Sequence, residues 1–257
     1  MDQVHHERVA IGHPGRWLLM LHGILGTGAN WRSIARRVVA ARPSWGAILV
    51  DLRGHGRSYA LGGPWTLDRV ADDREPLDFA AVLGHSFGGK IALLLSSRRP
   101  VDPLVLVDGN PGPRPTARGS EATTDVLSAL RTLPATFADR RAFVAALEAR
   151  GQPPSVAQWL AMNLVRDGDG VRFGPDLDGI EALLADYFAR DLWPLLEGRT
   201  ERTHAIVGGS STVLDAADRA RLSACPSVEL HVVEGAGHWV HADAPDEVLR
   251  LLTSALG

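Results

Sequence analysis

The order of apolar and polar segments predicts an α/β protein: a mostly parallel, twisted sheet flanked by helices, with an inserted helical lid. Two observations lead to this prediction. Short β-rich runs alternate with helical patterns in residues 1–111 and again in residues 201–257, the order typical of parallel sheets. Between them, residues 112–200 show proline-punctuated helical patterns and no strand pair. We therefore predict one core built from both flanking parts and a lid at 112–200.

The core elements follow from local patterns. The weakly alternating residues 1–11 predict one short antiparallel strand. Apolar runs bounded by turn residues predict buried strands at 17–21, 47–50, 79–83, 104–107, 204–207 and 228–233. Apolar positions at helical spacing predict helices at 30–41, 91–97, 216–222 and 246–256. A further short helix fits within 66–76, where Pro76 ends it.

Composition excludes several classes of protein. The 257 residues are 45% hydrophobic, enough for a sizeable core. A net charge of -3 gives no reason to expect nucleic acid or an anionic membrane as a partner. The single cysteine, Cys225, excludes an internal disulfide and a multi-cysteine metal site. With no leader pattern and no run of 18 apolar residues, we expect a cytoplasmic protein without a membrane span. Its oligomeric state is not predicted.

Residues 84–88 read G-H-S-F-G and lie between a predicted strand and a predicted helix. Such a serine sits on a sharp turn that exposes its hydroxyl, and the glycines let strand and helix approach closely. The turn also directs the amide of Phe87, at the positive end of the helix, toward an oxyanion beside the serine. The competing interpretation is that Ser86 is a simple helix N-cap, which would not require a strand directly before it. Because a predicted strand does precede it, we predict that Ser86 is a nucleophile.

A glycine-rich loop at residues 22–28 follows the first buried strand. Free backbone amides in such a loop can complete an oxyanion hole, and the N–H of Ile24 is the expected donor. The loop lacks the G-K-[ST] ending and the G-x-G-x-x-G spacing of phosphate cradles, so that alternative is weak.

A serine nucleophile needs a base, and the base needs an anion. His238 lies in a glycine-flanked loop after the last strand, whereas His241 is closer to the final helix, so His238 is the expected base. Asp108 follows the strand at 104–107, 22 positions after Ser86, and should face the same cleft. His55, in a polar turn, and Lys90, in the first turn after Ser86, are expected to be structural.

Four motifs carry a resemblance to the α/β-hydrolases, over nearly the whole chain. They are L-H-G at 21–23, D-L-R-G-H-G-R-S at 51–58, G-H-S-F-G-G-K at 84–90 and G-H-W-V-H-A at 237–242. The forms G-H-S-F-G-G-K and G-H-W-V-H-A most resemble those of small acyl esterases and thioesterases. The resemblance implies hydrolysis of a small-molecule ester or thioester through an acyl-enzyme, with no cofactor and no metal.

The chain departs from the family pattern at the acid. The family usually places it in the loop where this chain has G-G-S-S at 208–211. Asp215 is the nearest carboxylate, but its position before a helix is that of an N-cap. Asp108 occupies a position that some branches of the fold use, with Ser211 as a possible relay to the imidazole. We favour Asp108 and keep Asp215 as the alternative.

The lid is expected to supply the substrate-binding side chains. Helices are predicted at 121–133, 139–150, 155–166 and 177–196. Trp159, Phe188 and Trp193 are the candidate substrate contacts, although at least half of the lid aromatics are expected only to pack the lid onto the core.

The leading functional prediction is an esterase or thioesterase that favours an apolar acyl group. Two alternatives stay open. A C–C bond hydrolase or a lyase would use the same triad, and a ligand-binding receptor would carry a vestigial one.

Overall fold

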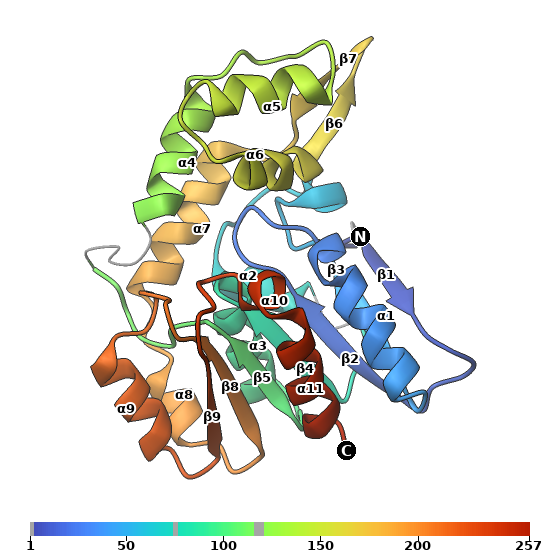
Figure 1. Ribbon diagram of the computed structural model, residues 1–257, viewed down its shortest axis with the longest axis vertical. Helices are drawn as coiled ribbons and strands as arrows, with labels where there is room; N and C mark the ends of the chain where they lie inside the picture. Colours follow the sequence, from blue (N-terminus) through green and yellow to red (C-terminus); the bar gives the residue numbers. More distant parts are fainter. Residues whose placement is uncertain (1–2, 74–76, 116–120) are drawn as a thin grey trace.

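A seven-stranded sheet forms the centre of the molecule (Figure 1). The computed structural model describes residues 3–73, 77–115 and 121–257. The strands are β1 (His6–Val9), β2 (Arg16–Leu21), β3 (Trp45–Val50), β4 (Ala81–His85), β5 (Leu104–Val107), β8 (Thr203–Gly208) and β9 (Val228–Val233). Their spatial order is β1-β3-β2-β4-β5-β8-β9, with β1 antiparallel to β3 and the other pairs parallel. The predicted strands are all present; Met1 and Pro76 lie outside the described residues.

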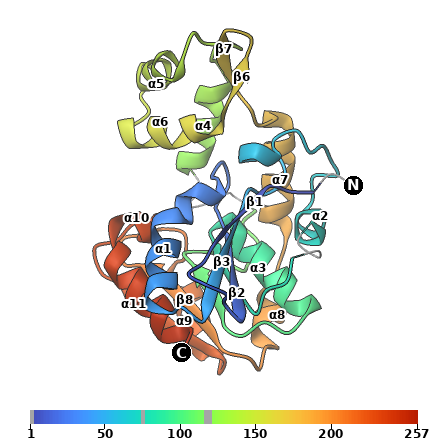
Figure 2. The ribbon, with the colours of Figure 1, turned by 90° about the vertical axis from the view of Figure 1, so that its right-hand side faces the viewer.

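Helices cover both faces of this sheet (Figure 2). They are α1 (Arg32–Ala41), α2 (Leu67–Asp72), α3 (Phe87–Arg98), α8 (Trp193–Glu197), α9 (Ala216–Ala224), α10 (Val240–Asp243) and α11 (Pro245–Ala255). Short 3-10 turns are η1 (Gly28–Trp31) and η2 (Gly56–Ser58).

Strand β2 shows why the strands read as continuous apolar runs. Leu18 and Met20 pack with α1 and α11 on one face, whereas Leu19 and Leu21 belong to the core of the other face with α3. All four side chains are fully buried, as expected for a parallel sheet covered on both sides.

The insertion stands off the sheet, at the top of Figure 1. It contains α4 (Glu121–Arg131), α5 (Arg140–Glu148), α6 (Pro154–Leu160), η3 (Ala161–Asn163), β6 (Leu164–Asp167), β7 (Gly170–Phe173) and α7 (Leu177–Ala189). Its apolar side chains continue the core cluster of the α3 face.

The prediction that the insertion has no strand pair was wrong, because β6 and β7 form an antiparallel hairpin. The helix expected at 155–166 ends at Leu160 for the same reason. Asp167 pairs with Gly170, so Gly168 and Asp169 form the two-residue loop, and Gly168 adopts φ +58. Gly-Asp between two strand patterns is a hairpin signal.

The helix expected at 177–196 is also broken. It ends at Ala189, and α8 begins at Trp193, whose amide is capped by the carboxylate of Asp191 at 3.0 Å. Pro194 accounts for the break, because a proline has no N–H for the carbonyl four residues earlier, here that of Arg190, and its ring would clash with that carbonyl in a continuous helix. Helix α8 packs against α3, so the part of the insertion that stands off the sheet runs from α4 to α7.

Lys90 joins the two ends of the insertion. Its buried ammonium donates to the carbonyls of Gly112 (2.8 Å), Tyr187 (2.5 Å) and Arg190 (2.6 Å). Gly112 precedes the insertion's first helix, and the other two lie at the end of α7. Burial, then the nearby charge of Arg114, lowers the pKa of Lys90 to about 7, and the charges of Asp191 and Asp186 oppose this effect. The three carbonyls supply one acceptor for each N–H of the ammonium.

Candidate active site

The serine turn is held by backbone geometry. Ser86 has φ 51 and ψ -115, an uncommon conformation for a residue with a side chain. Its amide donates to the carbonyl of Val107 at 2.9 Å. A Cβ on Gly84 would lie 2.1 Å from the carbonyl oxygen of Gly88, and one on Gly88 would lie 2.7 Å from that of His22. Both glycines are therefore required for the close approach of strand and helix.

The carboxylate of Asp108 lies at the end of β5 and is fully buried. Its Oδ2 accepts a hydrogen bond from Nδ1 of His238 at 2.6 Å and from Oγ of Ser211 at 2.5 Å. Its Oδ1 accepts from the amide of Gly208 at 3.0 Å. Three donors satisfy the buried carboxylate, which would otherwise be costly to desolvate.

Asp215, the alternative acid, and Ser211, the possible relay, both lie outside the direct contact between Asp108 and His238. Asp215 caps α9, where its side chain accepts the amide of Asp218 at 2.8 Å in a capping box. Ser211 contacts Asp108 beside the imidazole and does not lie between them, because the ring of His238 reaches the carboxylate directly. The relay expected of Ser211 is therefore not formed, and its hydroxyl contacts the carboxylate of Asp108 instead.

Neighbouring histidines support the loop that carries His238. Nε2 of His85 donates to the backbone carbonyl of His238 at 3.0 Å, and the two ring centroids are 4.7 Å apart. Burial, then the charges of His238 and His241, holds the pKa of His85 well below its usual range. His241 packs on Trp31 with centroids 4.5 Å apart, and burial, followed by the charge of His238, lowers its pKa to about 4.

The glycine-rich loop at residues 22–28 runs beside Ser86. A Cβ on Gly23 would lie 3.5 Å from Cβ of Ser86, and Ile24 lines the same cavity as the serine. Leu25 has φ 59, which turns the chain sharply after Ile24. The amide of Phe87, first residue of α3, follows the serine directly.

Asn163, from η3 of the insertion, is a site residue that sequence reasoning missed. Its side chain is buried, donates to the carbonyl of Leu25 at 2.7 Å and accepts from the amide of Gly56 at 3.0 Å. It thus connects the insertion to the loop of Ile24. A single asparagine inside a predicted helix carried no signal of this contact.

A cavity of about 460 Å³ opens at Ser86. The core contributes His22, Gly23, Ile24, Leu25, Gly26, Asn30, Trp31, His85, Ser86, His238, Trp239, His241 and Ala242. The insertion contributes Thr123, Asp125, Val126, Gly151, Gln152, Pro153, Ser155, Val156 and Trp159. Among the described residues, this lining includes one carboxylate, Asp125, and no lysine or arginine.

Of the three predicted lid contacts, Trp159 lines this cavity, with its ring 5.4 Å from that of Trp239. Phe188 and Trp193 do not. Trp193 is 3% exposed and lies under the guanidinium of Arg221 at 4.5 Å. Phe188 packs beside Tyr187, with centroids 5.5 Å apart. Both belong to the base of the insertion, where they pack it onto the core.

His55 lies in its turn away from the cavity. It is fully buried, donates from Nδ1 to the carbonyl of Arg53 at 2.9 Å, and packs edge-on against His22. Burial, then the charge of His22, lowers its pKa to about 3. A buried neutral imidazole with a backbone partner fits a structural role.

The sheet order, the serine turn and the histidine loop are those of a hydrolase fold, and the comparisons agree. A family model described as the alpha/beta hydrolase family matches residues 18–251, so the chain belongs to this family. It is 29% identical to the esterase YbfF of Escherichia coli (strain K12), over 93% of this chain and 92% of that protein.

Two further proteins are similar over most of the chain. The sn-1-specific diacylglycerol lipase ABHD11 of Mus musculus is 27% identical, over 93% of this chain and 80% of that protein. The solved structure of a marine microorganism esterase aligns with a TM-score of 0.84 at 23% identity, over 98% of both chains. Among the described residues, no helix is both long and apolar enough to cross a membrane.

Proposed function

We propose that this chain is a serine hydrolase that cleaves small carboxylic esters through an acyl-enzyme. The observation that carries the proposal is the 2.6 Å contact between His238 and the buried Asp108, at a cavity that Ser86 also lines. The names of the similar proteins, esterases and a diacylglycerol lipase, support the same reaction class.

In this mechanism Asp108 holds Nδ1 of His238 and leaves Nε2 to act as the base. Nε2 takes the proton of Ser86 while Oγ attacks the ester carbonyl carbon. The amides of Phe87 and Ile24 stabilise the oxyanion that forms. The imidazolium then protonates the leaving alcohol, and an acyl ester remains on Ser86. Water, deprotonated by the same imidazole, hydrolyses this ester and releases the acid.

The cavity favours a neutral ester with an apolar acyl group. Ile24, Val126, Val156 and Trp159 provide apolar surface for an acyl chain. A coenzyme A thioester would bring several phosphate charges, and the described lining offers Asp125 but no lysine or arginine to pair with them. We therefore place simple esters ahead of acyl-coenzyme A among the candidate substrates.

The nucleophile is tested by labelling and by substitution. A fluorophosphonate should add one adduct to the wild-type protein and none to Ser86→Ala. Hydrolysis of p-nitrophenyl esters by Ser86→Ala should fall on the order of 10⁴–10⁶ in kcat. Ser96→Ala is a matched control, because Ser96 lies on the same helix and bonds only the carbonyl of Leu93. Unimpaired ester turnover by Ser86→Ala would contradict the proposal.

A substrate panel tests the class of ester. p-Nitrophenyl esters and acyl-coenzyme A of matched chain lengths should give higher kcat/KM for the esters. Labelling of Ser86 without turnover of either set would favour the C–C bond hydrolase or lyase, whereas ligand binding without labelling would favour the receptor.

A further inference from the structure

Three metal-ligating side chains meet on the edge of the sheet, away from the catalytic cavity. In the register of β8 and β9, His204 lies opposite Glu229. His231 is two residues further along β9, so its side chain leaves the same face of the sheet as Glu229. None of the three lines the catalytic cavity.

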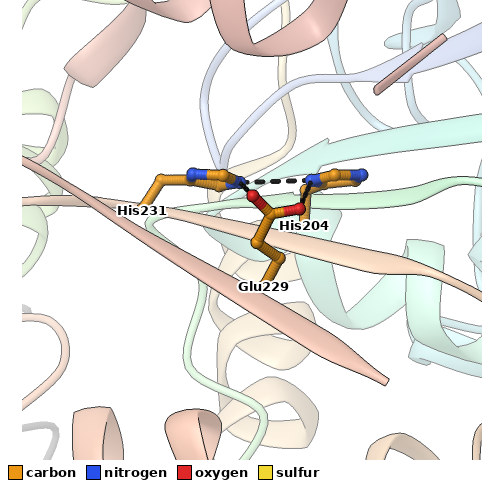
Figure 3. A group of neighbouring side chains, drawn as sticks. All are labelled: His204, Glu229 and His231. Carbon is orange, nitrogen blue, oxygen red and sulfur yellow. Dashed lines mark hydrogen bonds and ion pairs between the residues drawn. The ribbon is translucent and has the colours of Figure 1, made fainter. Parts of the chain in front are cut away.

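The side chains point into one common space (Figure 3). Nδ1 of His204 lies 3.1 Å from Nε2 of His231, and the two rings face each other through these nitrogens. The carboxylate of Glu229 reaches both: one oxygen is 3.4 Å from Nδ1 of His204, and the other is 3.6 Å from Nε2 of His231.

These separations match those of a tetrahedral metal site. Zinc binds imidazole nitrogen and carboxylate oxygen at about 2.0–2.2 Å, so neighbouring tetrahedral ligands lie about 3.3–3.5 Å apart. The two nitrogens are 3.1 Å apart, and each lies 3.4 or 3.6 Å from its own oxygen of Glu229, near that value. With one ligand atom taken from each residue, the three atoms all lie within 4.8 Å of one another. Two histidines and one glutamate are also a known zinc ligand set.

Hydrogen bonding alone uses this arrangement poorly. With both rings neutral, at most one hydrogen lies between Nδ1 of His204 and Nε2 of His231. The carboxylate of Glu229 offers only lone pairs, and its oxygens lie 3.4 and 3.6 Å from the two ring nitrogens, longer than the roughly 2.7–3.2 Å of a good N–H···O hydrogen bond. The other nitrogen of His204, Nε2, is buried without a hydrogen-bond partner, so the polar contacts of this ring all lie on the side of the cluster.

Two arginines near this cluster, Arg202 and Arg250, are paired with other carboxylates, so they leave the carboxylate of Glu229 available. Asp102, near His204, is paired with Arg202 at 3.1 Å. Glu247, near His231, is paired with Arg250 at 2.6 Å.

We propose that His204, Glu229 and His231 form a binding site for a divalent transition-metal ion such as Zn²⁺. The side chain of Glu229 is 67% exposed, so water can complete the coordination from the solvent side. The ion would link β9, the edge strand of the sheet, to its neighbour β8. We therefore expect it to stabilise the fold and to leave ester hydrolysis unchanged. This site departs from the expectation of no metal, which considered neither His204 nor His231.

Calorimetric titration of the whole, metal-free protein with ZnCl₂ tests the proposal. One Zn²⁺ should bind per chain and raise the Tm, and Mg²⁺, which prefers oxygen ligands, should do neither. Glu229→Gln and His231→Ala should each weaken Zn²⁺ binding at least about tenfold. Because Glu229 is exposed, its variant tests the site even if His231→Ala folds poorly.

Two control variants identify competing sites. His6→Ala removes one of two adjacent histidines near the N-terminus, and His238→Ala removes the catalytic base; both should keep the single tight site. Three outcomes would each overturn the proposal. Zn²⁺ binding could survive both Glu229→Gln and His231→Ala, it could disappear in His238→Ala or His6→Ala, or the wild-type protein could fail to bind Zn²⁺. Inhibition of ester hydrolysis with the same dependence on Zn²⁺ would also contradict a remote site.

Discussion

The candidate active site, at the carboxyl ends of β4 and β5, and the insertion above it are held by different kinds of interaction. At the candidate active site, backbone contacts position the residues: Ser86 is bonded through its amide to Val107, and Gly84 and Gly88 leave no room for a side chain. The insertion also depends on a few buried side chains. Lys90 bonds three carbonyls at its ends, and Asn163 bonds the loop of Ile24.

Because of this difference, we expect mutations to separate the chemistry at Ser86 from the attachment of the insertion. A substitution of Ser86, Asp108 or His238 changes a side chain and should leave the backbone of the serine turn intact. A substitution of a buried anchor leaves the triad in place but strips partners from several backbone carbonyls. The predictions below test this separation, starting with the largest effect.

Asp108→Asn should lower kcat by about 10⁴, because the imidazolium of His238 then lacks its anion. The Tm should change little. Asp215→Ala should behave in the opposite way: activity is kept, and the loss of a helix cap costs about 0.5–2 kcal/mol of stability. Steady-state kinetics and thermal unfolding measure both. An essential Asp215 beside a dispensable Asp108 would return the acid to the usual family position.

Lys90→Met should lower the free energy of unfolding by about 2–4 kcal/mol, because three buried carbonyls lose their donor. Urea unfolding measures this loss, and fluorophosphonate labelling of Ser86 should persist in the folded variant. Arg98→Met, on the exposed end of the same helix, is the control and should change stability by less than about 1 kcal/mol. Equal stability of the two variants would show that Lys90 does not anchor the insertion.

His241 and the buried His55 predict an effect that appears only in acid, a loss of stability. The unfolded chain protonates His241 near its ordinary pKa of about 6.5, whereas the folded chain does so only near 4. Between these values the unfolded state binds more protons, so stability falls as the pH falls, by at most about 1.4 kcal/mol per pH unit. The same argument extends to a pH of about 3 for His55.

His241→Gln should therefore flatten the dependence of unfolding free energy on pH between about 6.5 and 4. Urea titrations at several pH values across this range measure the slope. The exposed His13 supplies the control, since His13→Gln should leave the slope as it is in the wild-type protein. Identical slopes in His241→Gln and the wild type would show that His241 does not contribute to the acid sensitivity.

Local motifs in the sequence predicted the α/β fold and the position of each core strand. They also predicted the turn at Ser86 and the histidine loop after the last strand. These features depend on residues close together in the chain. A glycine beside a serine permits a tight turn, and an apolar run before a turn favours a buried strand, whatever the distant packing. The hairpin of β6 and β7 was missed, although its loop, Gly168-Asp169, is a local hairpin signal.

Contacts between distant segments were decided only by the tertiary structure. Asp108 and Asp215 both follow core strands, and only the placement of β5 beside β8 brings Asp108, rather than Asp215, to the ring of His238. The same holds for Asn163, which reaches Leu25 from 138 residues away, and for the cluster of His204 with β9, which the strand register creates. A one-residue change of register would turn each side chain of a strand to the opposite face, so a list of residue types alone cannot place such contacts.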